Sequence, residues 1–221
     1  MFQREILGNL KKWAAKPKRK PLILRGARQV GKTTLINEFA KQFGVYLYLN
    51  LENKRARMLF DEDFSMEELV SQIFLFCNKP REQGKRILLF IDEIQYSPSA
   101  VARLRYFYED VPGLFVIAAG SLLETLISAQ ISFPVGRVEY MAVRPCSFCE
   151  FLVAMGETEL EKAVRQHTVS QAIHSKTMSL FNTFTFTGGM PEIVAHFAEN
   201  RDFVSLNEIY RPLLTSNVPR N

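Results

Sequence analysis

The sequence predicts an α/β protein with three layers, in which a mainly parallel sheet of five strands lies between helices and is followed by a small helical region. Three observations predict it. Short apolar runs alternate with longer amphipathic stretches from residue 21 to residue 143, a glycine-containing turn joins the first run to the first amphipathic stretch, and only helical periods follow Pro145. We therefore divide the chain into a basic segment 1–20, a core 21–144 and a helical region 145–221.

The apolar runs give the expected strands, which cover residues 21–26, 45–52, 86–93, 113–121 and 136–143. The run at 86–93, RILLFIDE, is almost continuously apolar, as is typical of a parallel strand buried on both faces. Between the strands we expect helices at 32–43, 65–77 and 97–109. The second opens on the capping box Ser65-x-x-Glu68, and the third on Ser97 followed by Pro98.

The region after Pro145 lacks strand patterns. Its periods predict helices at 147–156, 159–173, 176–186 and 191–199, and a last segment that begins as a helix near Ser205. The box Thr158-x-x-Glu161 is expected to open the second of these helices, and Gly188 and Gly189 to separate the last two.

The composition is that of an ordinary globular chain, with 47% hydrophobic and 23% charged residues. The longest apolar runs are far shorter than the ~20 residues that a membrane-spanning helix needs. No secretory signal pattern is present at the N-terminus, so a cytoplasmic location without a membrane partner is expected.

Positive charge is concentrated near the N-terminus. Residues 1–32 hold ten of the 28 Lys and Arg residues and a single acid, Glu5. The segment KKWAAKPKRK places Trp13 among six Lys and Arg residues, a pattern that can contact nucleic acid. The alternative is a solvated linker that leads into the first strand.

The turn between the first strand and the first helix carries the clearest chemistry. Residues 26–33, GARQVGKT, match the pattern G-x-x-x-x-G-K-[ST] in the strand-loop-helix context that the pattern requires. Such a loop cradles phosphates, with Lys32 directed at the β and γ phosphates and the Thr33 hydroxyl at Mg²⁺. The expected binding residues are Gly26, Ala27, Arg28, Gln29, Val30, Gly31, Lys32, Thr33 and Thr34.

Two acids follow the third strand. Asp92 ends the buried run and is expected on the metal side of the site, together with Thr33. Glu93 is the next residue and is the candidate general base that activates water for attack on the γ-phosphate. One complete strand separates the loop strand from this carboxylate strand, which favours the ATPase branch of these proteins. No N-K-x-D motif for guanine is present, so ATP is favoured over GTP.

Two further residues are candidates with open alternatives. Ser121 ends the fourth strand and is either a sensor of the γ-phosphate or the N-cap of the next helix. Arg137 is either an arginine finger, in cis or in trans, or a surface arginine on a turn. Cys146 and Cys149 have C-x-x-C spacing but no second pair, so we expect packed, inert thiols. The three histidines form no ligand spacing and are expected to be structural or on the surface.

These residues carry a resemblance. Through GARQVGKTTL, LFIDEIQ, LRYFYE, AAGSLLE, SFPVGRVEYMAVRP with SFCEFL, and GGMPEIV, the chain resembles a prokaryotic family of AAA-like ATP-binding proteins close to the archaeal-ATPase and signal-transduction NTPase groups. The resemblance implies that the helical region is a lid and that Pro191 abuts the adenine ring. It also implies a C-terminal domain of unknown function, so that this chain, which ends soon after NEIYRPLLTS, is truncated.

The expected function is Mg²⁺-dependent ATP binding and hydrolysis that drives a switch, with the lid motion read by another domain or an unknown protein. The catalytic residues would be Lys32, Glu93, Ser121 and Arg137. The alternative is a nucleotide-gated binding module with little turnover, associated with DNA through the basic segment. A DNA-translocating motor would need a channel for nucleic acid that the sequence does not indicate.

Overall fold

The computed structural model describes residues 2, 4–120 and 136–215. The chain forms two compact units. The larger consists of Gly8–Arg28 and Lys32–Val143, and the smaller of Met1–Leu7, Gln29–Gly31 and Arg144–Asn221. Each unit is described by itself.

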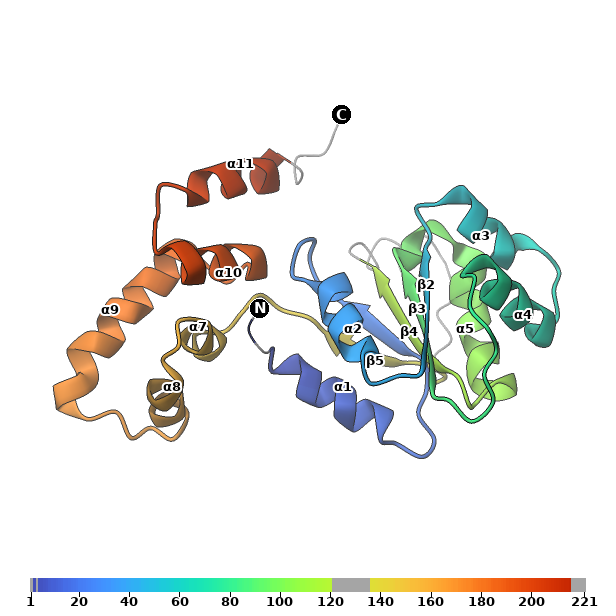
Figure 1. The fold of residues 1–221 in the computed structure, drawn as a ribbon, viewed down its shortest axis with the longest axis horizontal. Helices are drawn as coiled ribbons and strands as arrows, with labels where there is room; N and C mark the ends of the chain where they lie inside the picture. Colours follow the sequence, from blue (N-terminus) through green and yellow to red (C-terminus); the bar gives the residue numbers. More distant parts are fainter. Residues whose placement is uncertain (1, 3, 121–135, 216–221) are drawn as a thin grey trace. The chain divides into compact units, whose positions relative to one another are not determined.

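The larger unit is built on a parallel sheet (Figure 1). Its strands lie in the order β2-β3-β4-β1-β5, and every neighbouring pair is parallel. The α/β class and the five-stranded sheet expected from the sequence are therefore confirmed. The strands are β1 (Leu22–Arg25), β2 (Val45–Asn50), β3 (Ile87–Asp92), β4 (Phe115–Gly120) and β5 (Glu139–Ala142).

Helices cover both faces of the sheet because a parallel sheet needs crossovers between its strands. One face is covered by α1 (Ile6–Ala14) and α2 (Lys32–Ala40), and the other by α3 (Lys54–Asp61), α4 (Met66–Phe76) and α5 (Pro98–Asp110), as Figure 1 shows. A short 3-10 helix, η1 (Ile94–Tyr96), leads from β3 into α5.

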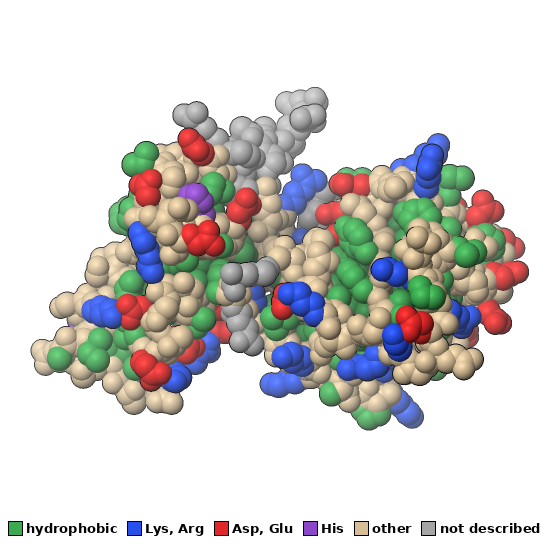
Figure 2. All heavy atoms as spheres, viewed as in Figure 1, with side chains coloured by type: hydrophobic (Ala, Val, Ile, Leu, Met, Phe, Trp, Pro, Cys, Tyr) green, Lys and Arg blue, Asp and Glu red, His purple; other side chains and the backbone are tan. Residues whose placement is uncertain are grey.

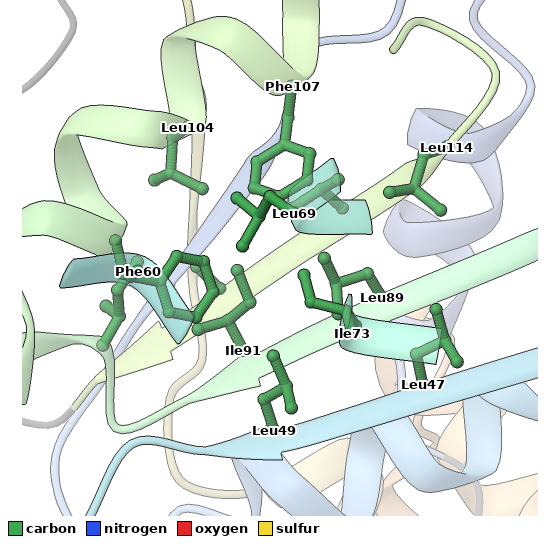
Figure 3. Packing of buried hydrophobic residues seen from close by; sticks show 14 of the residues in the cluster. Leu47, Leu49, Phe60, Leu69, Ile73, Leu89, Ile91, Leu104, Phe107 and Leu114 are labelled. Carbon is green, nitrogen blue, oxygen red and sulfur yellow. The ribbon is translucent and has the colours of Figure 1, made fainter. Parts of the chain in front are cut away.

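The main core lies between the sheet and helices α3, α4 and α5 (Figure 3). Leu89 and Ile91 of β3 meet Phe60 of α3, Ile73 of α4 and Phe107 of α5, and all five side chains are almost fully buried. Alternate residues of β2 face this core, whereas β3 and β4 are buried along nearly their whole length. This pattern explains why the central strands are the most continuously apolar in the sequence.

One alternative for the basic segment was a solvated linker. The structure shows that the segment is not a linker over its whole length. It contains α1, whose Leu10 and Trp13 are buried in the larger unit. The indole Nε1–H of Trp13 donates to the Lys20 carbonyl at 2.9 Å, and its ring packs near Phe39 and Phe115. Lys11 and Lys12 are exposed on the other side of the helix.

The smaller unit contains α7 (Phe148–Ala154), α8 (Thr158–Arg165), α9 (Gln171–Thr187), α10 (Pro191–Asn200) and α11 (Leu206–Thr215). Its core brings together Phe151 of α7, Ile193 and Phe197 of α10, and Leu206 of α11. A buried ion pair joins Arg4 to Glu150 (Nε to Oε1, 2.9 Å), so the start of the chain belongs to this unit.

Three local expectations were wrong. A helix, α3, follows β2 where none was expected, and Asn53 caps it by accepting a hydrogen bond from the Arg55 amide. Thr158 is the first residue of α8 rather than its N-cap. The N-cap is Glu157, whose side chain makes no capping hydrogen bond. The helix expected to run to residue 173 ends at Arg165, where His167 takes a left-handed conformation (φ 56°) and the Thr168 amide donates to the Ala163 carbonyl.

In the described part of the chain, no helix combines the length and the apolar character that crossing a membrane requires.

The burial of Trp13 generates a test of the N-terminal segment. Trp13→Ala should lower the free energy of unfolding by about 3–5 kcal/mol, because it removes a large aromatic side chain from a packed core. Lys12→Ala, on the exposed side of the same helix, is the control and should change it by less than about 0.5 kcal/mol. Urea unfolding followed by circular dichroism measures both. Similar small effects in the two variants would show that α1 does not pack on the sheet.

Candidate functional site

The loop from residue 26 to residue 31 joins β1 to α2 and curls through two left-handed residues, Gln29 (φ 65°) and Gly31 (φ 82°). Glycine takes such a conformation without strain, whereas a residue with a Cβ is destabilised there by roughly 1–2 kcal/mol. Lys32 opens α2, and its Nζ donates to the carbonyl oxygens of Gly26 and Ala27, each at 2.8 Å. The ammonium group of Lys32 is therefore held by the backbone of the loop that precedes it.

Lys32 is an unusual residue for a protein interior, since its exposed fraction is 7%. Burial lowers the pKa of its ammonium group, and the nearby carboxylates of Glu93 and Asp92 act in the opposite direction. Its two hydrogen-bond acceptors are neutral carbonyls rather than an acid. An anion at the loop would supply the negative charge that this buried cation lacks as a direct partner.

The loop and the end of β3 meet at two side chains. The Thr33 hydroxyl donates to Asp92 Oδ2 at 2.7 Å, although the two residues are 59 positions apart. The contact arises because β1 and β3 are parallel strands of one sheet. The residues that follow the two strands therefore leave the sheet at the same edge, its carboxyl edge. Thr33 and Asp92, expected to share a metal, are thus brought together.

Asp92 is held in a defined orientation. Its exposed fraction is 4%, and burial raises the pKa of the carboxyl group above its ordinary value. Its Oδ1 accepts from the Glu93 amide at 3.0 Å, and its Oδ2 also receives the Tyr48 hydroxyl at 3.4 Å, a long contact. Tyr48 was not foreseen. The signal available was its place in β2, which neighbours β3.

Glu93 lies directly after β3 in a left-handed conformation (φ 53°) that few residues with a side chain adopt. Its carboxylate accepts a hydrogen bond from Gln95 Nε2. Gln95 is a second residue that sequence reasoning missed, although it stands two positions away in the motif LFIDEIQ. The strained backbone and this bond together set where the Glu93 carboxylate lies.

The structure does not bring Arg137 to this edge. Arg137 precedes β5, whose first residue, Glu139, pairs with Leu22 at the start of β1, so it belongs to the amino edge of the sheet. It forms an ion pair there with Glu109 at 2.7 Å. The role as an arginine finger in cis is therefore wrong for this geometry, and a role in trans stays a prediction. Ser121, the candidate sensor, lies outside the described residues.

Three loop residues, Gln29–Gly31, group with the smaller unit. Arg4 Nη1 donates to the Val30 carbonyl at 3.3 Å, a contact that the sequence did not indicate. A Cβ built on Gly31 would lie 3.6 Å from Cγ of Pro191, the first residue of α10. The role of Pro191 beside adenine stays a prediction.

Of the three cysteines, Cys146 is buried, and Cys77 and Cys149 are partly buried. Burial raises the pKa of the Cys146 thiol to about 12, and all three cysteines are free. His196 hydrogen-bonds Ser205 at 2.9 Å within the smaller unit. No cluster of three or more His, Cys, Asp or Glu residues suited to a metal occurs among the residues that the structure describes.

Three features define a P-loop nucleotide-binding protein of the ATPase type. They are the parallel sheet, the phosphate-binding loop after β1, and the buried carboxylate at the end of β3, which β4 separates from β1. The model of the AAA domain family matches residues 18–152, and the chain belongs to that family.

Two comparisons extend this assignment. An uncharacterised protein of Methanocaldococcus jannaschii is 27% identical over an alignment of 160 residues that covers 68% of this chain and 31% of that protein. The chain thus matches about a third of that relative's length. The Walker-type ATPase of Pyrococcus abyssi has a similar fold, with a TM-score of 0.61 and 17% identity over 98% of this chain and 74% of that one.

The left-handed conformation of Gly31 leads to a test in which alanine substitutions at two glycines should change the free energy of unfolding in opposite directions. Gly31→Ala should lower the free energy of unfolding by about 1–2 kcal/mol, because alanine is strained at its φ of 82°. Gly8→Ala is the control, since Gly8 lies in α1 with no atom within 4 Å of an added Cβ. That change should raise the free energy by about 0.5–1 kcal/mol. Equal effects in urea unfolding would contradict the loop conformation.

Proposed function

We propose that this protein binds Mg·ATP at the loop 26–34 and hydrolyses it, acting as a nucleotide-driven switch. The hydrogen bond between Thr33 Oγ1 and Asp92 Oδ2 carries the proposal. It places a hydroxyl and a carboxylate, the two kinds of oxygen that hold Mg²⁺ in P-loop proteins, side by side at the end of the phosphate loop.

The donor set fits magnesium. Mg²⁺ is commonly held by one or two protein oxygen atoms, with water and substrate phosphates completing its shell. Thr33 and Asp92 would hold the ion, which when bound neutralises phosphate charge. Burial and the neighbouring charge of Glu93 raise the pKa of Asp92, and a divalent ion bound to this carboxylate would favour its charged form.

The phosphates would be held by the loop itself. Lys32 is a compact cation beneath the curled backbone, and α2 begins at this residue, so the positive end of the helix adds to its charge. The residues 26–34 named from the motif would therefore form one phosphate cradle. Pro191 would contact the adenine base, a role that rests on the family resemblance.

Glu93 would accept a proton from the attacking water. Its backbone position next to Asp92 supports this role, because the metal-side and water-side carboxylates then follow each other at one strand end. Gln95 would hold the Glu93 carboxylate in place as a positioning residue. Binding and release of the phosphates would change the conformation of the smaller unit through Gln29–Gly31. An unknown partner would respond to that change.

A second candidate function is a nucleotide-gated binding module with little turnover. The engagement of Glu93 with Gln95 favours it, since a carboxylate that is already bonded is a weaker acceptor for a proton from water. The rate of ATP hydrolysis distinguishes the two functions.

Lys32→Ala tests nucleotide binding. The change should weaken ATP roughly tenfold to a hundredfold, because a charge-assisted contact to phosphate is worth roughly 1.5–3 kcal/mol. Lys41→Ala, which removes an exposed lysine paired with Glu38 at the other end of α2, is the control and should bind ATP as the wild type does. Calorimetric titration measures both. Equal affinity of the wild type and Lys32→Ala would end the assignment of the loop.

The two carboxylates should have separable roles. Asp92→Asn should weaken ATP binding in the presence of Mg²⁺ but not in its absence, because it removes the charge on the metal side. Glu93→Gln should keep Mg·ATP affinity and lose turnover by a factor on the order of a hundred or more. Phosphate release and calorimetry measure the two effects. A Glu93→Gln variant that hydrolyses ATP at the wild-type rate would refute the water-activating role.

A further inference from the structure

A second cluster of cations lies at the amino edge of the sheet, the edge opposite the phosphate loop. Arg19 precedes β1 and Arg86 precedes β3, whereas the loop follows β1 and Asp92 ends β3. All these strands are parallel, so the two arginines stand where the strands begin. A ligand held there would be separate from the nucleotide site.

Aromatic rings support the two guanidinium groups. The Arg19 guanidinium carbon lies 3.3 Å from the centroid of the Phe115 ring, and that of Arg86 lies 4.7 Å from the same ring and 4.8 Å from Phe43. Arg19 Nη2 also donates to the carbonyls of Pro112 and Gly113, at 3.1 and 3.2 Å. These contacts hold the planar donors in place, so less side-chain freedom is lost when an anion binds.

The charge of this cluster is not balanced. In the described part of the chain, Lys16 and Lys85 pair with Glu139 and Glu82, whereas Arg19 and Arg86 form no ion pair with an acid. Arg19 Nε is buried without an acceptor. Burial lowers the pKa of Arg19, and the like charge of Arg86 lowers it further. Two cations are thus held against one aromatic ring at a cost that an anion near them would reduce.

Further cations extend the cluster along the chain. Lys18 and Lys20 flank Arg19, and Lys11 and Lys12 end α1; none of the four forms an ion pair among the described residues. Figure 2 shows Lys and Arg side chains gathered on the side of the larger unit where Figure 1 places α1 and the connection from α1 to β1. The cations come from the end of α1, from the connection to β1 and from the residue before β3, so the positive charge is distributed rather than confined to one side chain, which suits a ligand with repeated negative charges.

The aromatic residues of this region decide what kind of polyanion fits. Trp13 and Phe115 are buried, with exposed fractions of 2% and 7%, so neither ring is free to stack on a base or to enter a lipid layer. A membrane surface site would present apolar side chains together with its cations. What this edge offers is forked guanidinium donors and lysines, the groups that recognise phosphodiester oxygens.

We propose that the amino edge of the sheet, through Arg19, Arg86, Lys18 and Lys20, binds the phosphate backbone of nucleic acid without reading its bases. The pattern KKWAAKPKRK suggested contact with nucleic acid; because Trp13 is buried, such contact would come from the cations around it and not from its ring. The proposal does not rest on the nucleotide site, because that site occupies the other edge.

The test is fluorescence anisotropy with labelled 20-nucleotide single-stranded and duplex DNA of two unrelated sequences, over a range of salt concentrations. The wild type should bind all of them, with an affinity that falls linearly in a double-logarithmic plot against salt. Arg86→Ala should weaken binding roughly fivefold and make the salt slope smaller by about one. Arg86→Lys keeps the charge but loses the fork, and should fall between the two.

Matched controls separate this edge from charge in general. Arg55→Ala removes an exposed arginine from α3, which follows the carboxyl end of β2, and should leave DNA affinity unchanged. Lys32→Ala should also bind DNA as the wild type does, which distinguishes failure of this proposal from failure of the nucleotide site. If urea unfolding shows that Arg86→Ala is not folded, the double variant of Lys18→Ala and Lys20→Ala takes its place with the same expected direction.

Three results would overturn the proposal. The first is no DNA binding by the wild type at about 50 mM salt, where such contacts are strong. The second is an equal loss in Arg55→Ala and Arg86→Ala, which would show only diffuse attraction. The third is binding to vesicles with anionic lipids that depends on Arg86 while DNA does not bind, which would make the edge a membrane surface site.

Discussion

The parallel register of the sheet is the constraint on which the rest of this structure depends. Five parallel strands must each return through a crossover, and in this chain the crossovers cover both faces, so the central strands are buried on each side. The same register sends the end of every strand to one edge. Thr33 and Asp92 come from distant parts of the chain and reach hydrogen-bond distance because β1 and β3 finish together. The site is therefore a consequence of strand direction before it is a consequence of any particular side chain.

Buried polar groups in this chain differ in how burial affects their charge. The described residues include five buried polar or charged side chains, and three of them complete helix caps or hydrogen bonds within helices. Ser97 caps α5, Glu150 caps α7 and pairs with Arg4, and Thr187 donates to the Thr183 carbonyl. Lys32 and Asp92 also have partners, the loop carbonyls and the Thr33 hydroxyl, yet burial shifts the pKa of each toward its neutral form. Such a shift opposes the charged form of each group, and groups perturbed in this way are more common at functional sites than elsewhere.

The sequence predicted the parts of this structure that local patterns determine. Apolar runs located all five strands, and the glycine-lysine pattern located the loop, because both depend on short-range chemistry. The helix α3 was missed, since its apolar stripe is short and its cap is an asparagine in a polar stretch. The end of α8 was missed because histidine, not glycine, takes the left-handed position. Tyr48 and Gln95 were overlooked, and the place of Arg137 at the amino edge was not predicted, because their partners follow from tertiary placement that spacing does not encode.

The two edges of the sheet use cations in different ways. At the carboxyl edge, Lys32 is enclosed by its own loop carbonyls, which suits one tightly held ligand. At the amino edge, Arg19 and Arg86 lie on aromatic rings, with Arg19 partly buried and Arg86 exposed, which suits an exchangeable polyanion. The six residues of β3 separate the edges by roughly 17–20 Å at about 3.3 Å per residue. That distance is about twice the Debye length of ~8 Å at physiological salt. Direct electrostatic coupling between the edges is therefore weak, and any influence of one ligand on the other must pass through movement of the strands and the helices packed on them.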